Sequence, residues 1–212
     1  MTQSLDAIDG YRYKAGAAHA HSHQFLMPAV RRELAAVRER LGTPRLFDLG
    51  CGNGSVAALL SREGWDVTGV DPSTEGISAA RTAYPHLRLE PGSAYDDLAA
   101  RFGRFPVVLS LEVVEHVYAP RDYARTLSDL LEPGGTAIIS TPYHGYWKNL
   151  ALAVTGKMDH HFTALWDHGH IKFWSAQTLS ELLAEAGLRQ VSLVRVGRVP
   201  ALARSMIMVA RK

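Results

Sequence analysis

The chain has 212 residues, which corresponds to about one to one-and-a-half domains of ordinary size. Its 47% hydrophobic and 21% charged residues exclude a disordered tail, a collagen-like fibre and a disulfide-stapled miniprotein. A formal net charge of +2 is too small to predict a nucleic-acid partner. The single cysteine, Cys51, cannot form an internal disulfide, and neither a membrane span nor a signal peptide is evident. We therefore expect a cytoplasmic protein.

After an irregular polar opening segment, the apolar spacing predicts alternating helices and strands. Helices are expected over residues 25–41, 55–62, 74–83, 121–131 and 175–186, and strands over 45–49, 66–70, 87–89, 107–111, 136–140, 191–196 and 206–210. This alternation indicates βαβ units, hence an α/β fold whose mostly parallel sheet is covered by helices on both faces. No repeat or linker divides the chain, so we expect a single domain over 1–212. It would include an N-terminal arm and helix over 1–42 and a lid-like insertion over 142–174.

A glycine-rich turn follows the first predicted strand, in the sequence Asp48-Leu-Gly-Cys-Gly-Asn-Gly54. Glycines permit tight backbone turns and close approach to a ligand, and the helix that follows offers free N–H groups. Asp71 ends the next strand, where a carboxylate can accept hydrogen bonds from both hydroxyls of a ribose. These features predict a nucleotide-cofactor site at the carboxyl edge of the sheet.

Two cofactors fit this loop. Residues 52–57 satisfy the loose dinucleotide pattern G-x-G-x-x-G/A, whereas residues 48–54 match the E/D-x-G-x-G-x-G loop of S-adenosylmethionine (SAM) enzymes without a gap. The charge of Asp48 disfavours a pyrophosphate and favours the cationic amino-acid end of SAM. An NAD(P)-binding oxidoreductase remains the alternative from another class.

The stretch from Leu46 to Gly187 resembles the class I SAM-dependent methyltransferases. The matching pieces are DLGCGNG (48–54), GVDPS (69–73), PGSAYDDL (91–98), VVLSLEVVEHV (107–117), LLEPGGTAIISTP (130–142) and LSELLAEAGL (179–188). Within that superfamily the chain is most similar to the O-methyltransferases of ubiquinone biosynthesis, in its E-x-x-E-H sequence and in the insertion. The resemblance implies a Rossmann-like, seven-stranded sheet whose last strand is antiparallel.

The resemblance also implies the cofactor contacts. The loop would line the methionine end of SAM, Asp71 would hold the ribose, and the segment after the third strand would contact adenine. The candidate cofactor residues are Asp48, Gly50, Cys51, Gly52, Gly54, Asp71, Pro72, Ser93, Ala94 and Leu111. Many relatives carry an acidic residue in place of Ser93. We expect Asp71→Ala to weaken SAM binding while leaving the fold intact.

Catalytic candidates follow the strand 107–111, at the active edge of the sheet: Glu112, Glu115 and His116, with His144 in addition. If this segment is one helical turn, the first three share a face. That face can supply a base, or a two-carboxylate, one-imidazole site for a divalent metal such as Mg²⁺, as the resembled enzymes imply. The alternative is that Glu115 and His116 only cap and pair locally.

The insertion contains five of the ten histidines, His144, His160, His161, His168 and His170, together with many aromatic residues. Such residues suit a lid that recognises a flat, polar-edged substrate and excludes water. Residues 146–158 read either as a membrane-surface segment or as a helix packed on its own domain. Residues 189–212 contain six basic residues and no acidic one, which favours an anionic substrate or lipid headgroups, or reflects a solvated strand edge.

These observations predict a methyltransferase that moves a methyl group from SAM to an oxygen of a small aromatic or quinone-like molecule. An N-methyltransferase of a small heterocycle or amine is an alternative, as is a non-catalytic SAM-binding partner. The expected partner is a small-molecule acceptor, with no nucleic acid and with peripheral membrane contact as an option. The sequence does not predict the oligomeric state.

Overall fold

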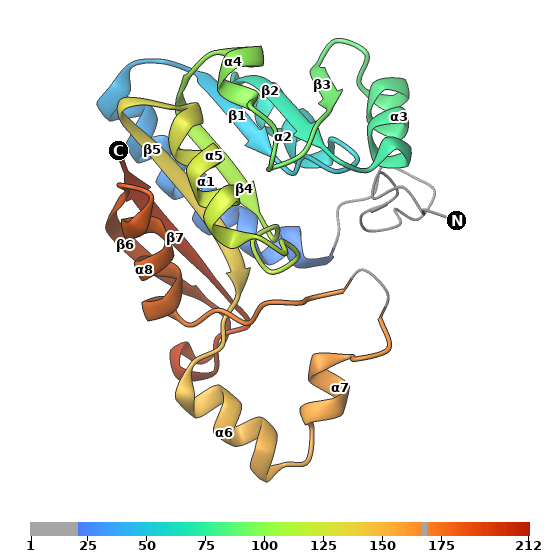
Figure 1. Ribbon diagram of the computed structural model, residues 1–212, viewed down its shortest axis with the longest axis vertical. Helices are drawn as coiled ribbons and strands as arrows, with labels where there is room; N and C mark the ends of the chain where they lie inside the picture. Colours follow the sequence, from blue (N-terminus) through green and yellow to red (C-terminus); the bar gives the residue numbers. More distant parts are fainter. Residues whose placement is uncertain (1–20, 167–168) are drawn as a thin grey trace.

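The computed structural model describes residues 21–166 and 169–212 (Figure 1). The first 20 residues of the N-terminal arm and helix predicted over 1–42, and His168, lie outside the described residues. A seven-stranded sheet has the order β3-β2-β1-β4-β5-β7-β6. The strands are β1 Arg45–Leu49, β2 Asp66–Asp71, β3 Arg88–Pro91, β4 Phe105–Leu111, β5 Leu131–Pro142, β6 Arg189–Val196 and β7 Ser205–Arg211. As expected, β7 is antiparallel, here to both β5 and β6, while the β1–β2, β1–β4, β2–β3 and β4–β5 pairs are parallel.

Helices cover both faces of this sheet, which confirms the predicted Rossmann-like α/β class (Figure 1). One apolar cluster joins the sheet to α1 His21–Leu41, α2 Ser55–Arg62 and α3 Thr74–Ala83. The other joins it to α4 Leu98–Phe102, α5 Pro120–Leu130 and α8 Ala176–Glu185. All seven residues of β4 are buried, as a central strand between two helical layers requires.

Most element bounds agree with the sequence prediction, and the differences have local causes. The strand β5 begins at Leu131 instead of residue 136, because Leu131 pairs with Phe105 across a register shift in β4. The helix α4 was not predicted, since five residues are too few to show a period; Asp97 caps it by accepting a hydrogen bond from the Ala100 N–H at 3.0 Å.

The insertion between β5 and α8 contains two short helices, α6 Tyr146–Val154 and α7 Met158–Phe162. It extends beyond the carboxyl end of β5 and then returns towards α8, as Figure 1 shows in orange. A 3-10 helix, η2 Pro200–Leu202, connects β6 to β7 and contacts α6. The insertion and this connection therefore stand at the sheet edge where ligands bind in α/β folds.

Candidate active site

The glycine loop connects β1 to α2 at the carboxyl edge of the sheet. The N–H groups of Gly50 and Cys51 both donate to the carbonyl oxygen of Val70, at 2.8 and 2.9 Å, which fastens the loop to β2. Gly50, Gly52 and Gly54 all have positive φ, at 90°, 54° and 74°. A Cβ on Gly50 would lie 2.3 Å from Cγ2 of Val113, so the loop also needs glycine there for space.

Asp71 ties this loop to the end of β2. Its carboxylate accepts hydrogen bonds from the N–H of Gly52 at 2.8 Å and from the N–H of Ser73 at 2.9 Å. Burial raises the pKa of Asp71, and the two N–H donors oppose that rise. Pro72, which lies between Asp71 and Ser73 in the chain, is exposed. Because Asp71 holds two loops, its loss would weaken the fold as well as ligand binding. The expectation that Asp71→Ala leaves the fold intact is therefore revised.

Asp48 lies on β1 beside the loop and is 2% exposed. Within the described residues, its Oδ2 atom has no hydrogen-bond partner. Burial, together with the negative charge of Asp71, raises the pKa of Asp48 to about 7. Burial and both carboxylates also raise the pKa of the Cys51 thiol well above its usual value, which makes that thiol unreactive near neutral pH.

The remaining predicted cofactor residues stand at neighbouring strand ends. Leu111 is the last residue of β4 and is 6% exposed. Ser93 and Ala94, both half-buried, follow β3 in a turn in which the Ser93 N–H donates to Oδ2 of Asp96 at 2.8 Å. The structure thus brings the loop, Asp71 and Leu111 to one edge of the sheet, in the order β3, β2, β1, β4.

Glu112 follows β4 directly and has φ 58°, a conformation that costs energy for a residue other than glycine. Ser140 at the end of β5 holds it: the Glu112 N–H bonds both the carbonyl and the Oγ of Ser140 at 3.1 Å, and the Ser140 hydroxyl donates to Oε1 of Glu112 at 2.9 Å. Burial raises the pKa of Glu112 to about 7, although Ser140, Arg204 and Lys148 oppose the rise.

The segment after Glu112 is not the single helical turn that would place all three catalytic candidates on one face. Glu112 has a left-handed conformation, so it cannot be part of a right-handed helical turn. The turn includes only residues 113–116, in which the His116 N–H donates to the carbonyl oxygen of Val113 at 2.9 Å. In the group that could bind a metal, His170 of the insertion stands beside Glu115 and His116, where the sequence predicted Glu112. The potential ligand atoms of Glu115, His116 and His170 all lie within 4.8 Å of one another.

Of these three residues, Glu115 is buried and the two histidines are half-buried. Glu115 is 1% exposed, and neither carboxylate oxygen has a hydrogen-bond partner of normal geometry within the described residues. Burial raises the pKa of Glu115 well above its usual value, and the charge of Glu112 adds to the rise. Burial, with the charge of His116 added, lowers the pKa of His170 to about 4. Nδ1 of His116 lies 3.2 Å from the carbonyl oxygen of Gly169.

The returning limb of the insertion is fastened to this segment. The N–H groups of Ile171 and Lys172 donate to the carbonyl oxygen of Glu115 at 2.9 and 3.0 Å. The indole N–H of Trp174 donates to the carbonyl oxygen of Val114 at 3.0 Å. The predicted lid is therefore bonded to the residues that follow β4.

His144, at the start of the insertion, lies among aromatic rings. Its ring centroid is 5.1 Å from that of Phe173 and 5.7 Å from that of Phe162. Burial, together with the charge of Lys148, lowers the pKa of His144 to about 4, so its imidazole is neutral at neutral pH.

The sequence reasoning did not select Ser140, Lys148 or Arg204 as site residues. Ser140 lies inside a predicted apolar strand, and its hydrogen bonds to Glu112 arise only because the neighbouring strand β4 ends beside it. Lys148 is only 9% exposed although it lies on a helix with apolar residues on its outer side. The available signal for Lys148 was a lysine directly after two aromatic residues, Tyr146 and Trp147, and Arg204 offered none.

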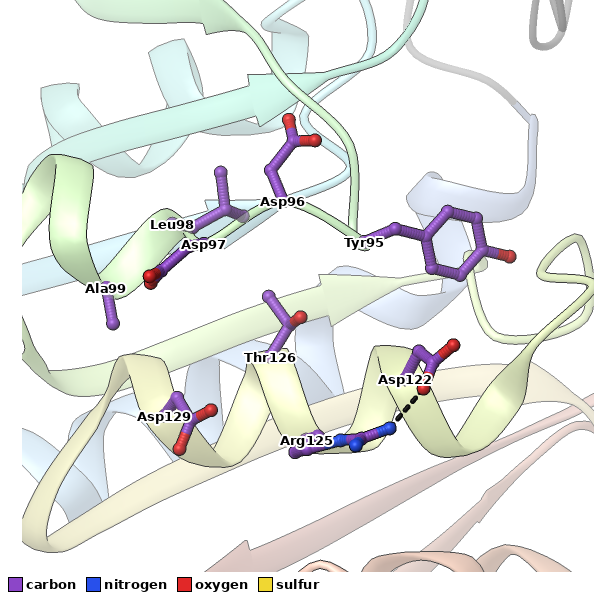
Figure 2. A pocket seen from close by; sticks show the side chains of 9 residues that line it. All are labelled: Tyr95, Asp96, Asp97, Leu98, Ala99, Asp122, Arg125, Thr126 and Asp129. Atoms are coloured by element: carbon purple, nitrogen blue, oxygen red, sulfur yellow. Dashed lines mark hydrogen bonds and ion pairs between the residues drawn. The ribbon is translucent and has the colours of Figure 1, made fainter. Parts of the chain in front are cut away.

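Two hollows lie outside the glycine loop. One, of about 310 Å³, lies between residues 95–99 and one side of α5 (Figure 2). It contains none of the predicted cofactor residues; at its rim the Tyr95 hydroxyl accepts hydrogen bonds from the N–H groups of Tyr118 and Ala119, at 2.8 and 3.2 Å. The other, of about 680 Å³, is lined by Phe25, Gly197, Arg198, Val199, Leu202 and Arg204.

Two solved structures with the same fold are described as methyltransferases. A putative sarcosine dimethylglycine methyltransferase from Galdieria sulphuraria superposes with a TM-score of 0.65 at 14% identity, covering 87% of this chain and 83% of that one. A magnesium protoporphyrin IX methyltransferase from Synechocystis, solved with bound SAH, gives 0.61 at 17% identity, covering 94% and 90%. At these identities the likeness establishes the fold.

The sequence comparisons are more specific. A ubiquinone biosynthesis O-methyltransferase from a Caulobacter species is 38% identical over 175 residues, which are 72% of this chain and 69% of the relative. An enzyme of the same name from Cereibacter sphaeroides is 36% identical over 154 residues, covering 69% of this chain and 61% of the relative. A family model described as a methyltransferase domain matches residues 20–193. The chain therefore belongs to the methyltransferase-domain family and is a SAM-dependent methyltransferase.

Proposed function

We propose that this methyltransferase transfers the methyl group of SAM to a hydroxyl oxygen of a small aromatic or quinol-like acceptor. The observation that carries the proposal is Glu112, a half-buried carboxyl held in a strained conformation at the carboxyl end of β4, with its pKa raised to about 7. A base is most effective when its pKa lies near the working pH. The names of the relatives, ubiquinone biosynthesis O-methyltransferases, support the same acceptor class.

SAM supplies an electrophilic sulfonium methyl, so the protein must bind the cofactor and align the acceptor oxygen. We assign the loop over 50–54 to the methionine end of SAM and Asp71 to the ribose. The Oδ2 atom of Asp48, which has no hydrogen-bond partner among the described residues, is a suitable acceptor for the cationic amino group. Ser93 and Ala94 are assigned to adenine, and Leu111 to the surface beneath the cofactor.

The proposed step breaks the bond between the methyl group and the sulfonium sulfur, and forms a bond from the methyl group to the acceptor oxygen. Glu112 takes the hydroxyl proton, and the sulfur keeps the electron pair as S-adenosylhomocysteine (SAH) forms. Neutral His144 is the second candidate base. The insertion, bonded to residues 114 and 115, excludes water from the acceptor.

A divalent metal such as Mg²⁺ is a further part of the proposal, because a metal would polarise an acceptor oxygen. Two ligands of one ion with bonds of about 2.2 Å lie at most about 4.4 Å apart. The ligand atoms of Glu115, His116 and His170 lie within 4.8 Å of one another, so the distances fit one ion after small side-chain rotations. One carboxylate and two imidazoles suit zinc or iron better than Mg²⁺, which prefers oxygen ligands. Glu112, which the sequence placed in this set, is held by Ser140 instead.

Peripheral membrane contact is also proposed, through the outer face of α6. Tyr146, Trp147, Leu150 and Val154 on this helix are 73%, 63%, 40% and 78% exposed. Exposed apolar residues at helical spacing suit the interface between headgroups and acyl chains. Among residues 21–166 and 169–212, no helix is both long and apolar enough to cross a membrane.

The test is an assay of the purified protein with SAM and catechol acceptors, with and without Mg²⁺, in which mass spectrometry and NMR identify the methylated atom. We expect O-methylation, and we expect Glu112→Gln to lower kcat by roughly 100- to 10,000-fold while SAH affinity is retained. The matched control is Glu39→Gln, at an exposed position of α1. Methylation of amines instead supports the N-methyltransferase alternative. Binding of SAH without turnover of any acceptor supports the non-catalytic alternative.

A further inference from the structure

Tyr95 connects two segments that the sheet keeps apart. It directly follows Ser93 and Ala94, in the turn after β3, and its side chain extends from this turn towards the start of α5 (Figure 2). Its hydroxyl accepts hydrogen bonds from the N–H groups of Tyr118 and Ala119, in the segment between β4 and α5. Because β2 and β1 lie between β3 and β4 in the sheet, this bridge is made by a side chain and not by strand pairing.

The turn after β3 is held by bonds that do not involve the Tyr95 hydroxyl. The Ser93 N–H donates to Oδ2 of Asp96 at 2.8 Å, and the Asp96 N–H donates to the carbonyl oxygen of Ser93 at 3.1 Å. The Tyr95 N–H donates to Oγ of Ser93 at 3.2 Å. The turn therefore keeps these bonds without the hydroxyl, whose own two bonds are both directed to the other segment.

At that other end, the hydroxyl replaces a local cap of α5. Ala119 is the N-cap residue of α5, and its methyl side chain cannot accept the hydrogen bond that serine, threonine, aspartate or asparagine would accept there. Tyr118 is 82% exposed, so packing of its ring contributes little to holding this stretch. The Tyr95 hydroxyl, more than 20 residues earlier in the chain, supplies the acceptor.

The bridged segment also carries two of the residues that could bind a metal. Glu115 and His116 precede Tyr118 by three and two positions. The insertion holds the segment from its other side, since the Lys172 N–H donates to the carbonyl oxygen of Glu115 at 3.0 Å. The Lys172 ammonium lies 5.8 Å from the centroid of the Tyr118 ring. A shift at Tyr118 would therefore reach both the metal-binding group and the insertion.

We propose that Tyr95 is a positioning residue, whose hydroxyl links the turn over 93–94 to residues 115–119, so that a bound cofactor fixes Glu115 and His116 in place. The inference rests on the proposed assignment of this turn to the adenine of SAM. Adenine packed on the turn restricts the Tyr95 ring, and the hydroxyl then restricts the two N–H groups that it binds. The cofactor and the residues after β4 are thereby coupled in free energy.

The test is hydrogen–deuterium exchange of the full chain, followed by mass spectrometry with and without SAH. In the unmodified protein, SAH should slow exchange at 93–94 and at 115–119. In Tyr95→Phe, SAH should still slow exchange at 93–94, whereas its effect at 115–119 should fall by roughly 5- to 100-fold, the range for two backbone hydrogen bonds. The matched control is Tyr118→Phe, which removes a neighbouring exposed hydroxyl and keeps the backbone donor, and which should behave as the unmodified protein.

A merely structural hydroxyl gives a different result. Tyr95→Phe would then speed exchange at 118–119 equally with and without SAH, and the effect of SAH on 115–119 would remain, which overturns the inference. Absence of an SAH effect at 93–94 in the unmodified protein also overturns it, because the cofactor then does not reach the turn.

Turnover gives a second readout. With catechol acceptors, Tyr95→Phe should lower kcat by roughly 5- to 100-fold while SAH affinity, measured by calorimetry, stays within about threefold. An unchanged kcat, or an equal loss of kcat and of SAH affinity, overturns the inference. If SAH changes the exchange at 115–119 as expected but no acceptor is methylated, the inference stands and the proposed reaction fails.

Discussion

Asp71 offers a direct test of how the cofactor edge is built, because its carboxylate accepts two backbone hydrogen bonds. Asp71→Ala would leave the N–H groups of Gly52 and Ser73 buried without acceptors, at about 1–3 kcal/mol each, hence about 2–6 kcal/mol in total. Asp71→Asn keeps one acceptor oxygen and loses the other. Both substitutions also relieve the repulsion between Asp71 and Asp48 equally, so the difference between them isolates one hydrogen bond.

We therefore expect Asp71→Ala to be less stable than Asp71→Asn by about 1–3 kcal/mol, which is at least about 2 °C in Tm for a chain of this size. Thermal unfolding followed by circular dichroism measures the difference, and Asp66→Asn at the exposed start of β2 is the control. SAH affinity, measured by calorimetry, should fall at least about tenfold in both variants. A Tm for Asp71→Ala equal to or above that of Asp71→Asn would refute the bracing role, and unchanged affinity would refute the ribose assignment.

Three further predictions concern the same edge. The folded-state pKa of Asp48 is raised to about 7, so the fold is most stable with respect to this group below about pH 4 and loses that stability as pH rises to 7 and the carboxyl ionises. Thermal melts should therefore show that Asp48→Asn raises Tm at pH 8 and not at pH 4. Gly50→Ala should cost roughly 2–4 kcal/mol from its positive φ and its contact with Val113, and Val113→Ala should restore part of this loss in urea unfolding. The turnover rate should increase as pH rises through about 7, where Glu112 ionises, and this step should be absent from the pH profile of Glu112→Gln.

The glycine loop could be predicted because its requirements are local. Positive φ at Gly50, Gly52 and Gly54 and the start of α2 immediately afterwards are encoded in a dozen consecutive residues. The same holds for Asp71 at the end of β2. The chain order of the elements then places both at one sheet edge, since parallel strands end together.

The acceptor side could not be predicted in this way. The acceptor side is built from the residue after β4, from β5, from α6 and from the segment before β7, and no spacing relates these residues: Glu112, Ser140, Lys148 and Arg204. His170 joined Glu115 and His116 where Glu112 was expected, because the left-handed conformation at residue 112 turns the chain. A periodic pattern does not reveal one strained residue.

The sequence by itself determined the α/β class, the strand–loop–helix of the cofactor site and the methyltransferase family, because hydrophobic period and glycine conformation act over a few adjacent residues. Only the tertiary structure decided which charges meet. Lys148 is buried against the backbone of Arg204, 56 residues away, and its pKa and those of Glu112 and His144 depend on that packing. Electrostatic interactions and desolvation depend on distance in space, and the fold sets those distances.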